Sequence, residues 1–247
     1  METYTDPIVQ KTIGEIVTSD WRQAEVFKKY GIDFCCGGKR TVAEACEQKD
    51  LDVQQVEHDL LQVKENLSAS GLHFIHWNLD FLTDYIVNNH HAYVREAIPF
   101  LTQLSTKVAL MHGDRHPELN EIDQHIAAVT EELTTHMRKE EMVLFPYIRQ
   151  MALAQQSNVP FLPPAFGTIA NPIAMMESEH TSAGHSMYNI QKLSCQFTTP
   201  ADACTSYKVL FAKLQEFQQD LFQHIHLENN ILFPQALKLE AQLFSKR

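Results

Sequence analysis

Apolar residues recur at helical spacing along most of the chain. Residues three, four and seven positions apart share one face of an α-helix. Such stripes predict long amphipathic helices over about 78–111, 117–154, 171–197 and 199–243. Shorter stripes precede them, over 21–30 and after residues 41 and 51. Four long helices with short connections are typical of a four-helix bundle, so we expect an all-α protein.

The first part of the chain contains residues that typically begin or end short helices. Gly31 is suited to ending a helix in the left-handed conformation, and Thr41 with Glu44 has the spacing of a capping box. The small polar run 67–71 is the best linker candidate. We therefore predict a small helical domain over 1–66, a linker over 67–77 and the bundle over 78–247.

Composition narrows the class of protein. Only 8 Gly and 10 Pro leave little room for the turns of a β-sandwich or barrel, and a net charge of −11 disfavours binding to nucleic acid or to a membrane surface. No apolar run approaches the length of a membrane span, and the first residues lack the layout of a signal peptide. With five cysteines and no export signal, we expect a cytoplasmic protein.

An internal repeat places histidine and glutamate at matched positions. His136-x3-Glu140 and His224-x3-Glu228 are each followed by Leu-Phe-Pro, and the two stretches are 88 residues apart (224 − 136 = 88). His91 and His180, on the preceding helices, are 89 residues apart (180 − 91 = 89). The repeat therefore predicts that the bundle consists of two similar helix pairs.

These residues point to a metal site inside the bundle. Positions i and i+4 project from one face of a helix, and here that face is the apolar one. One buried His-x3-Glu pair alone would be explained by a hydrogen bond within the helix, but two in a repeat are not. Imidazole and carboxylate suit iron, manganese or zinc, and carboxylates can bridge two metal ions. His112, near the end of the first long helix, is predicted as a seventh, asymmetric ligand.

Two further groups of residues are candidates for supporting chemistry. Glu132 and Glu179 lie close in sequence to predicted ligands, where they could orient an imidazole or supply protons; ordinary solvated glutamates remain the alternative. Cys35 and Cys36 are adjacent, and Cα atoms about 3.8 Å apart are too close for an unstrained disulfide. We expect reactive thiols whose pKa is lowered by the nearby cations, with a tight structural loop as the alternative.

The repeated stretches 136–146 and 224–234, together with Met176–His180 and Asp33–Lys39, resemble the hemerythrin-like iron–sulfur cluster repair proteins (repair of iron centres family). The resemblance covers nearly the whole chain. It implies a hemerythrin-like bundle behind a Cys-Cys-Gly-Gly domain, and two non-haem iron ions with an oxo bridge. The implied ligands are His91, His112, His136, Glu140, His180, His224 and Glu228.

The same resemblance implies a function in repairing iron–sulfur clusters damaged by nitrosative or oxidative stress. Nitric oxide or oxygen would be the small ligand, damaged iron–sulfur proteins the clients, and the electron donor is unknown. Reduction of nitric oxide and donation of iron are both open, as is a homodimer. The alternative is a reversible oxygen or nitric oxide sensor or carrier without turnover.

Overall fold

The computed structural model describes residues 7–65, 74–157, 159, 161, 164 and 166–245. The chain forms two compact units, each described by itself below. Met1–Asn78 with Ile225–Gln235 is called the cysteine-loop unit, and Leu79–His224 with Ala236–Arg247 the bundle unit. Residues 67–73 of the predicted linker lie outside the described range, and its last part is a 3-10 turn, η3 (Phe74–His76).

Short capped helices build the N-terminal part of the cysteine-loop unit. The predicted capping box of Thr41 and Glu44 is present, and a second one joins Thr12 and Glu15. Gly31 has φ of 63°, as its predicted role in ending a helix requires. The elements are η1 (Ile8–Gln10), α1 (Ile13–Ser19), η2 (Trp21–Gln23), α2 (Ala24–Lys29), α3 (Val42–Gln48) and α4 (Val53–Glu65).

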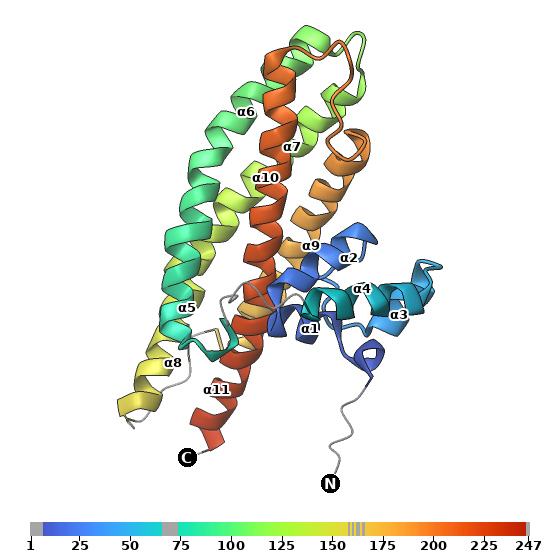
Figure 1. Cartoon of the computed structure of the whole chain (residues 1–247). Coiled ribbons are helices and arrows are strands. Elements are labelled where there is room, and N and C mark those ends of the chain that lie inside the picture. The colour runs from blue at the N-terminus through green and yellow to red at the C-terminus, as the bar shows by residue number, and fades with distance from the viewer. Residues whose placement is uncertain are drawn as a thin grey trace. The chain divides into compact units, whose positions relative to one another are not determined.

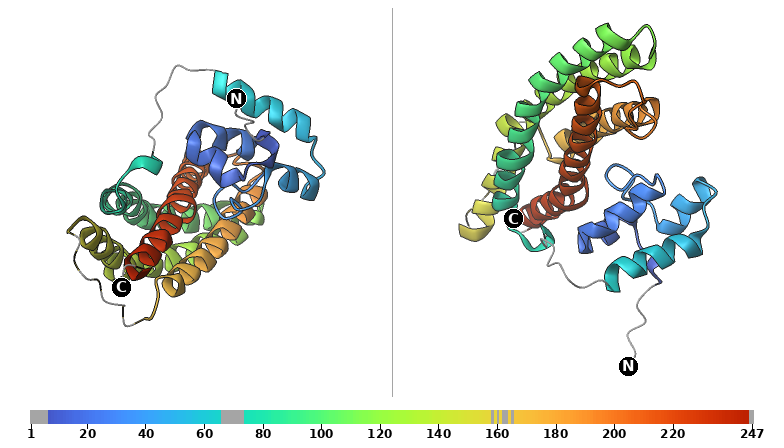
Figure 2. Two further views of the ribbon diagram at one scale, coloured as in Figure 1. Left: turned by 90° about the horizontal axis from the view of Figure 1, so that it is seen from below. Right: turned by 45° about the horizontal axis from the view of Figure 1, so that its top comes forward.

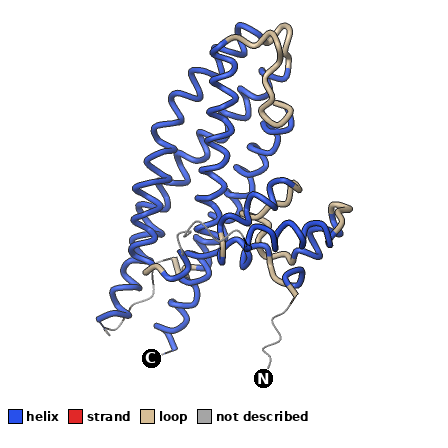
Figure 3. The backbone as a smooth tube through the Cα atoms, viewed as in Figure 1, coloured by secondary structure: helices blue, strands red, loops and turns tan. Residues whose placement is uncertain are grey.

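Four long helical runs follow, as the apolar pattern predicts (Figure 1; Figure 3). The third run is a single α-helix, whereas each of the others contains a π-helical segment. The runs are α5 (Leu79–Tyr85), η4 (Ile86–His91) and α6 (Ala92–His112); α7 (Glu118–Lys139), η5 (Glu140–Leu144) and α8 (Phe145–Ser157); α9 (Ala170–Leu193); and α10 (Thr205–Leu227), η6 (Glu228–Leu232) and α11 (Phe233–Ser245). The fold is therefore an all-α four-helix bundle preceded by small helices, which confirms the predicted class.

The long helices pack side by side around one apolar core (Figure 2). Helix α7 contacts α6 and α9. Helix α10 completes the ring, because Phe217 lies 6.3 Å from Tyr93 of α6 and Phe222 lies 5.1 Å from Tyr188 of α9, measured between ring centroids. No helix of the described residues has the length and apolarity that crossing a membrane requires.

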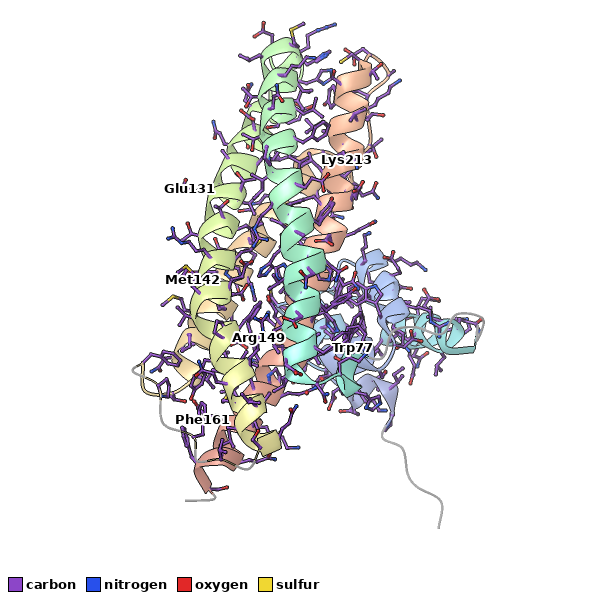
Figure 4. The ribbon with its side chains drawn as sticks, turned by 90° about the vertical axis from the view of Figure 1, so that its left-hand side faces the viewer. Trp77, Glu131, Met142, Arg149, Phe161 and Lys213 are labelled. Carbon is purple, nitrogen blue, oxygen red and sulfur yellow. The ribbon has the colours of Figure 1, made fainter. Side chains whose placement is uncertain are left out.

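The π-helical segments lie where the repeat places its chemistry. His91 ends η4, Glu140 begins η5 and Glu228 begins η6. In η5 and η6 the backbone N–H of the following phenylalanine donates to the glutamate carbonyl five residues earlier. A proline follows each phenylalanine and lacks the N–H of the regular helical bond. Met142 projects to the outside of η5 (Figure 4) and is exposed. Such π segments are frequent at functional sites.

Candidate metal centre

Two pairs of buried histidines face each other in the core of the bundle. The Nε2 atoms of His91 and His224 are 3.2 Å apart, and those of His136 and His180 are 3.0 Å apart. All four side chains are at most 2% exposed. Each pair combines histidines from two different helical runs, so the packing of the bundle sets its geometry.

A fully buried carboxylate lies between the two pairs. Glu140 Oε2 is 3.3 Å from His91 Nε2 and also 3.3 Å from His136 Nε2. Glu228 lies one helical turn after His224 on the same continuous run, and it too is fully buried. The ligand atoms of His91, Glu140, His224 and Glu228 lie within 4.8 Å of one another, as do those of His136, Glu140, His180 and Glu228. The two groups share both glutamates.

Carboxylates behind the histidines select which ring nitrogen carries the proton. Glu141 Oε1 is 2.7 Å from Nδ1 of His91, and Glu179 Oε2 is 2.9 Å from Nδ1 of His136. A carboxylate accepts, so Nδ1–H of each ring donates to it. Nε2 of a neutral ring then presents its lone pair to the centre of the cluster. Both rings are therefore held in the tautomer that a metal ion requires.

A cation lies beside each of these two carboxylates. Arg95 pairs with Glu141, and Lys139 pairs with Glu179. Burial alone would raise the pKa of Glu179, but the hydrogen bonds from Lys139 and His136 outweigh it and leave this pKa below its ordinary value. Glu179 is therefore an anion at neutral pH and can polarise the His136 ring.

The structure separates the remaining sequence candidates from the cluster. Glu132 accepts hydrogen bonds from Ser182 Oγ at 3.1 Å and makes no hydrogen bond or ion pair with a predicted ligand among the described residues. Glu141, which does contact a ligand, is not predicted from the sequence pattern. Its position directly after Glu140 was the available signal.

His112 is also separated from the cluster, which corrects the predicted set of seven ligands to six. It lies 21 residues after His91 (112 − 91 = 21), and the helical rise of about 1.5 Å per residue puts roughly 30 Å between them. Its Nε2 is instead 3.1 Å from Cys204 Sγ.

The donor set fits metal ions of intermediate hardness. A buried carboxylate is costly unless it is paired or coordinates a metal, and two imidazole lone pairs that face each other repel. A cation beside each histidine pair removes both costs. Four nitrogens and two carboxylates, with no thiolate, suit iron, manganese or zinc bound in two neighbouring positions.

The loop with the paired cysteines belongs to the cysteine-loop unit. Asp33 Oδ1 accepts from the backbone N–H groups of Cys35 and Cys36, at 3.0 Å and 2.9 Å, and from the Cys35 thiol at 3.2 Å. Both cysteines are free thiols, with their sulfurs 3.8 Å apart. These three side chains form a third group that could hold a metal ion.

Burial changes the chemistry expected of Cys35. Its side chain is almost fully buried, and this burial, with the neighbouring Cys36 and Asp33, raises its pKa well above the ordinary value. The expectation of a lowered thiol pKa is therefore wrong for Cys35, because the thiol is buried in the loop and shielded from solvent. Cys36 is half-exposed and is the more accessible of the two sulfurs.

The same unit holds this loop against the segment that carries Glu228. The Asn230 side-chain amide donates to the carbonyls of Phe34 and Cys35, at 3.3 Å and 3.2 Å, and Asn229 donates to Cys35 O at 3.3 Å. A Cβ at Gly38 would collide with the Asn230 side-chain amide, so a larger residue there would displace that amide. The loop is thus anchored one and two residues after a predicted metal ligand.

Comparison with known proteins places both parts of the chain. Residues 82–236 match the family described as "Hemerythrin HHE cation binding domain", and residues 9–64 match "Domain of Unknown function (DUF542)". An "Iron-sulfur cluster repair protein YtfE" of Enterobacter sp. (strain 638) is 38% identical over 91% of this chain and 96% of its own length. Proteins with the same name are 37% identical in Escherichia coli O157:H7, over 91% and 96%, and 35% identical in Musicola paradisiaca (strain Ech703), over 94% and 98%.

Proposed function

Since this chain belongs to the family of iron–sulfur cluster repair proteins with a hemerythrin domain, we propose that it repairs damaged clusters through two iron ions held in the bundle. The observation that carries the proposal is the pair of histidine groups joined by Glu140. A reversible oxygen or nitric oxide carrier, the other function left open by the sequence, is not favoured by the shared name of the relatives.

The proposed ligands divide into two half-sites. His91 and His224 would hold one ion, and His136 and His180 the other, with Glu140 and Glu228 available to both. Two oxygens on each carboxylate allow it to bridge, whereas an imidazole serves one ion. When bound, the iron pair would supply ferrous electrons and open coordination positions for nitric oxide or oxygen, and an oxo bridge in the ferric state.

Protons can reach this centre through the carboxylates behind the histidines. A pocket of about 410 Å³ is lined by Arg95 and Glu141, and another of about 480 Å³ is lined by Lys139 and Glu179. Reduction of nitric oxide to nitrous oxide consumes protons as well as electrons. Glu141 and Glu179 lie between these pockets and the two Nδ1 atoms, where each can accept a proton from solvent or from a histidine.

The cysteine loop is proposed to act in exchange with clients. Cys36 is half-exposed, and Cys35 beside it keeps a protonated, buried thiol. Asp33 adds a hard oxygen ligand to the two sulfurs. Such a group can take up an iron ion or a nitrosyl group for a short time without a stable disulfide forming, because adjacent cysteines cannot reach an unstrained one.

The test measures repair and its chemistry in the same variants. Glu140→Leu removes a shared ligand, so it should lose iron and fail to restore a nitric-oxide-damaged cluster enzyme. Cys35→Ser with Cys36→Ser should keep two irons yet lose repair in stressed cells. Repair by a Glu140→Leu protein that lacks iron would contradict the proposed use of the bundle.

Two product assays decide how repair is achieved. Nitrous oxide from the reduced protein would indicate reduction of nitric oxide, and iron transfer to an apo-cluster protein would indicate donation. Reversible binding of nitric oxide with neither product would instead establish the carrier function.

A further inference from the structure

His112 has a structural setting of its own, remote from the metal centre. It ends α6, its side chain is nine-tenths buried, and its Nε2 is directed at the sulfur of Cys204, 3.1 Å away. Cys204 is exposed and directly precedes α10. Its carbonyl accepts a helical hydrogen bond from Lys208 N at 3.1 Å. A buried imidazole thus contacts an accessible thiol at a helix N-terminus.

The protonation of the ring follows from its surroundings. Nδ1 of His112 is buried and has no hydrogen-bond partner among the described residues. A proton on that nitrogen would be a buried donor left unsatisfied, which is costly. The proton therefore belongs on Nε2, so that N–H donates to Cys204 Sγ and the sulfur is the acceptor. A charged acceptor makes the stronger hydrogen bond, and the N-terminus of a helix also favours negative charge.

Neighbouring groups leave this arrangement undisturbed. Asp202, two residues before Cys204, is paired with His116 at 3.2 Å and Arg115 at 3.6 Å. The ring of Tyr207 lies 5.5 Å from that of His112. Burial, with acidic neighbours, raises the pKa of Tyr207 to about 12, so the phenol stays neutral. The Asp202 carboxylate is thus engaged by Arg115 and His116, and the buried Tyr207 ring beside His112 carries no charge at neutral pH.

We propose that Cys204 and His112 form a second, thiol-based site that reacts with low-molecular-weight disulfides. The Cys204 thiolate, held by His112 Nε2–H, attacks one sulfur of the disulfide. A bond from Cys204 Sγ to that sulfur forms and the original S–S bond breaks. Cys204 is oxidised, the departing sulfur is reduced, and it takes from solvent the proton that Cys204 released on ionising. The product is a mixed disulfide on the chain, and a second thiol reverses the reaction.

The chain contains a matched control for this reactivity. Cys195 is also exposed, but no described residue donates a hydrogen bond to its sulfur. It lies in a turn where residues 195–197 all have positive φ, rather than directly before a helix. Exposure alone therefore predicts equal reaction at Cys195 and Cys204, whereas the histidine contact predicts a preference for Cys204.

The experiment treats the full-length protein with oxidised glutathione and follows each cysteine by peptide mass spectrometry. We expect Cys204 to be modified about tenfold faster than Cys195, and His112→Gln to remove that difference. Iron content of His112→Gln is measured alongside and should not change, because His112 lies far from the metal ligands; its unfolding midpoint is measured to confirm that the variant is folded.

Two results would overturn the proposal. One is modification of Cys204 at the same rate as Cys195 in the unaltered protein, a comparison that needs no variant to fold. The other is an unchanged Cys204 rate in His112→Gln. If His112→Gln unfolds, Tyr207→Phe keeps the ring beside the histidine and should leave the Cys204 rate as it is; a tenfold loss there would assign the reactivity to the phenol instead.

Discussion

Glu141 allows the two halves of the metal centre to be weakened separately. Replacing it with Gln keeps the size of the side chain and removes the charge that holds His91 Nδ1–H at 2.7 Å. Loss of such a partner costs about 10–100-fold in metal affinity, or roughly 1.4–2.7 kcal/mol. Because His91 belongs to only one histidine pair, this loss should fall on one of the two ions.

Chelator competition measures this loss directly. The ferrous protein is titrated with a chelator of graded strength while the released iron is counted. Glu141→Gln should release its first iron at about 10–100-fold lower chelator concentration and its second close to the unaltered value. Glu179→Gln, behind His136, should give the mirror result. Glu132→Gln is the control, because Glu132 contacts Ser182 rather than a ligand.

A different release pattern would refute the reasoning. If Glu141→Gln behaves like Glu132→Gln, the Glu141 carboxylate does not tune the histidine. If Glu141→Gln and Glu179→Gln each weaken both ions equally, the division into two half-sites is incorrect.

Three more predictions concern single residues. Glu240 is buried and accepts hydrogen bonds from Tyr147 Oη at 2.9 Å, Thr168 Oγ1 at 2.6 Å and Ile169 N at 2.9 Å. Glu240→Ala should therefore lower the free energy of unfolding in urea by about 3–5 kcal/mol, and Glu240→Gln should lower it less. Equal losses in the two variants would contradict a stabilising role of these hydrogen bonds. Burial raises the folded-state pKa of Cys35 well above its ordinary value of 9.0. The contribution of Cys35 to stability is therefore complete below pH 9 and is lost as pH rises further, by up to about 1.4 kcal/mol per pH unit. Unfolding of Cys35→Ala compared with the unaltered protein should lack that part of the pH dependence, and parallel curves would exclude it. His112→Gln should retain two irons per chain by metal analysis, and a loss of iron would return His112 to the ligand set.

The fold was predictable because amphipathic periodicity and capping are local. The four apolar stripes correspond to the four helical runs; the Thr41 capping box begins its helix and Gly31 follows the end of another, as expected. The π segments were not foreseen. Widened helical turns become favourable here because residues far apart in sequence converge on one cluster. The periodicity of apolar residues does not indicate where such convergence occurs.

The site was predictable only in part, for a related reason. A spacing of four residues fixes the direction of a side chain, which is why the His-x3-Glu pairs converge. It does not say which carboxylate lies behind a ring on another helix, as Glu141 does for His91 across 50 residues. The place of His112 in the repeat suggests a ligand, but the helical rise separates residues 91 and 112 by roughly 30 Å. The depth of Cys35 likewise depends on contacts with Asn229 and Asn230, about 195 positions later.

We propose that Glu140 and Glu228 join two histidine pairs into a centre for two iron ions. Metal analysis of the protein purified from iron-replete cells, combined with its absorption spectrum, tests this most directly. We expect two irons per chain and the near-ultraviolet absorption of an oxo-bridged ferric pair, and we expect both to be absent from Glu140→Leu. One zinc ion per chain, or a single iron without that absorption, would contradict it.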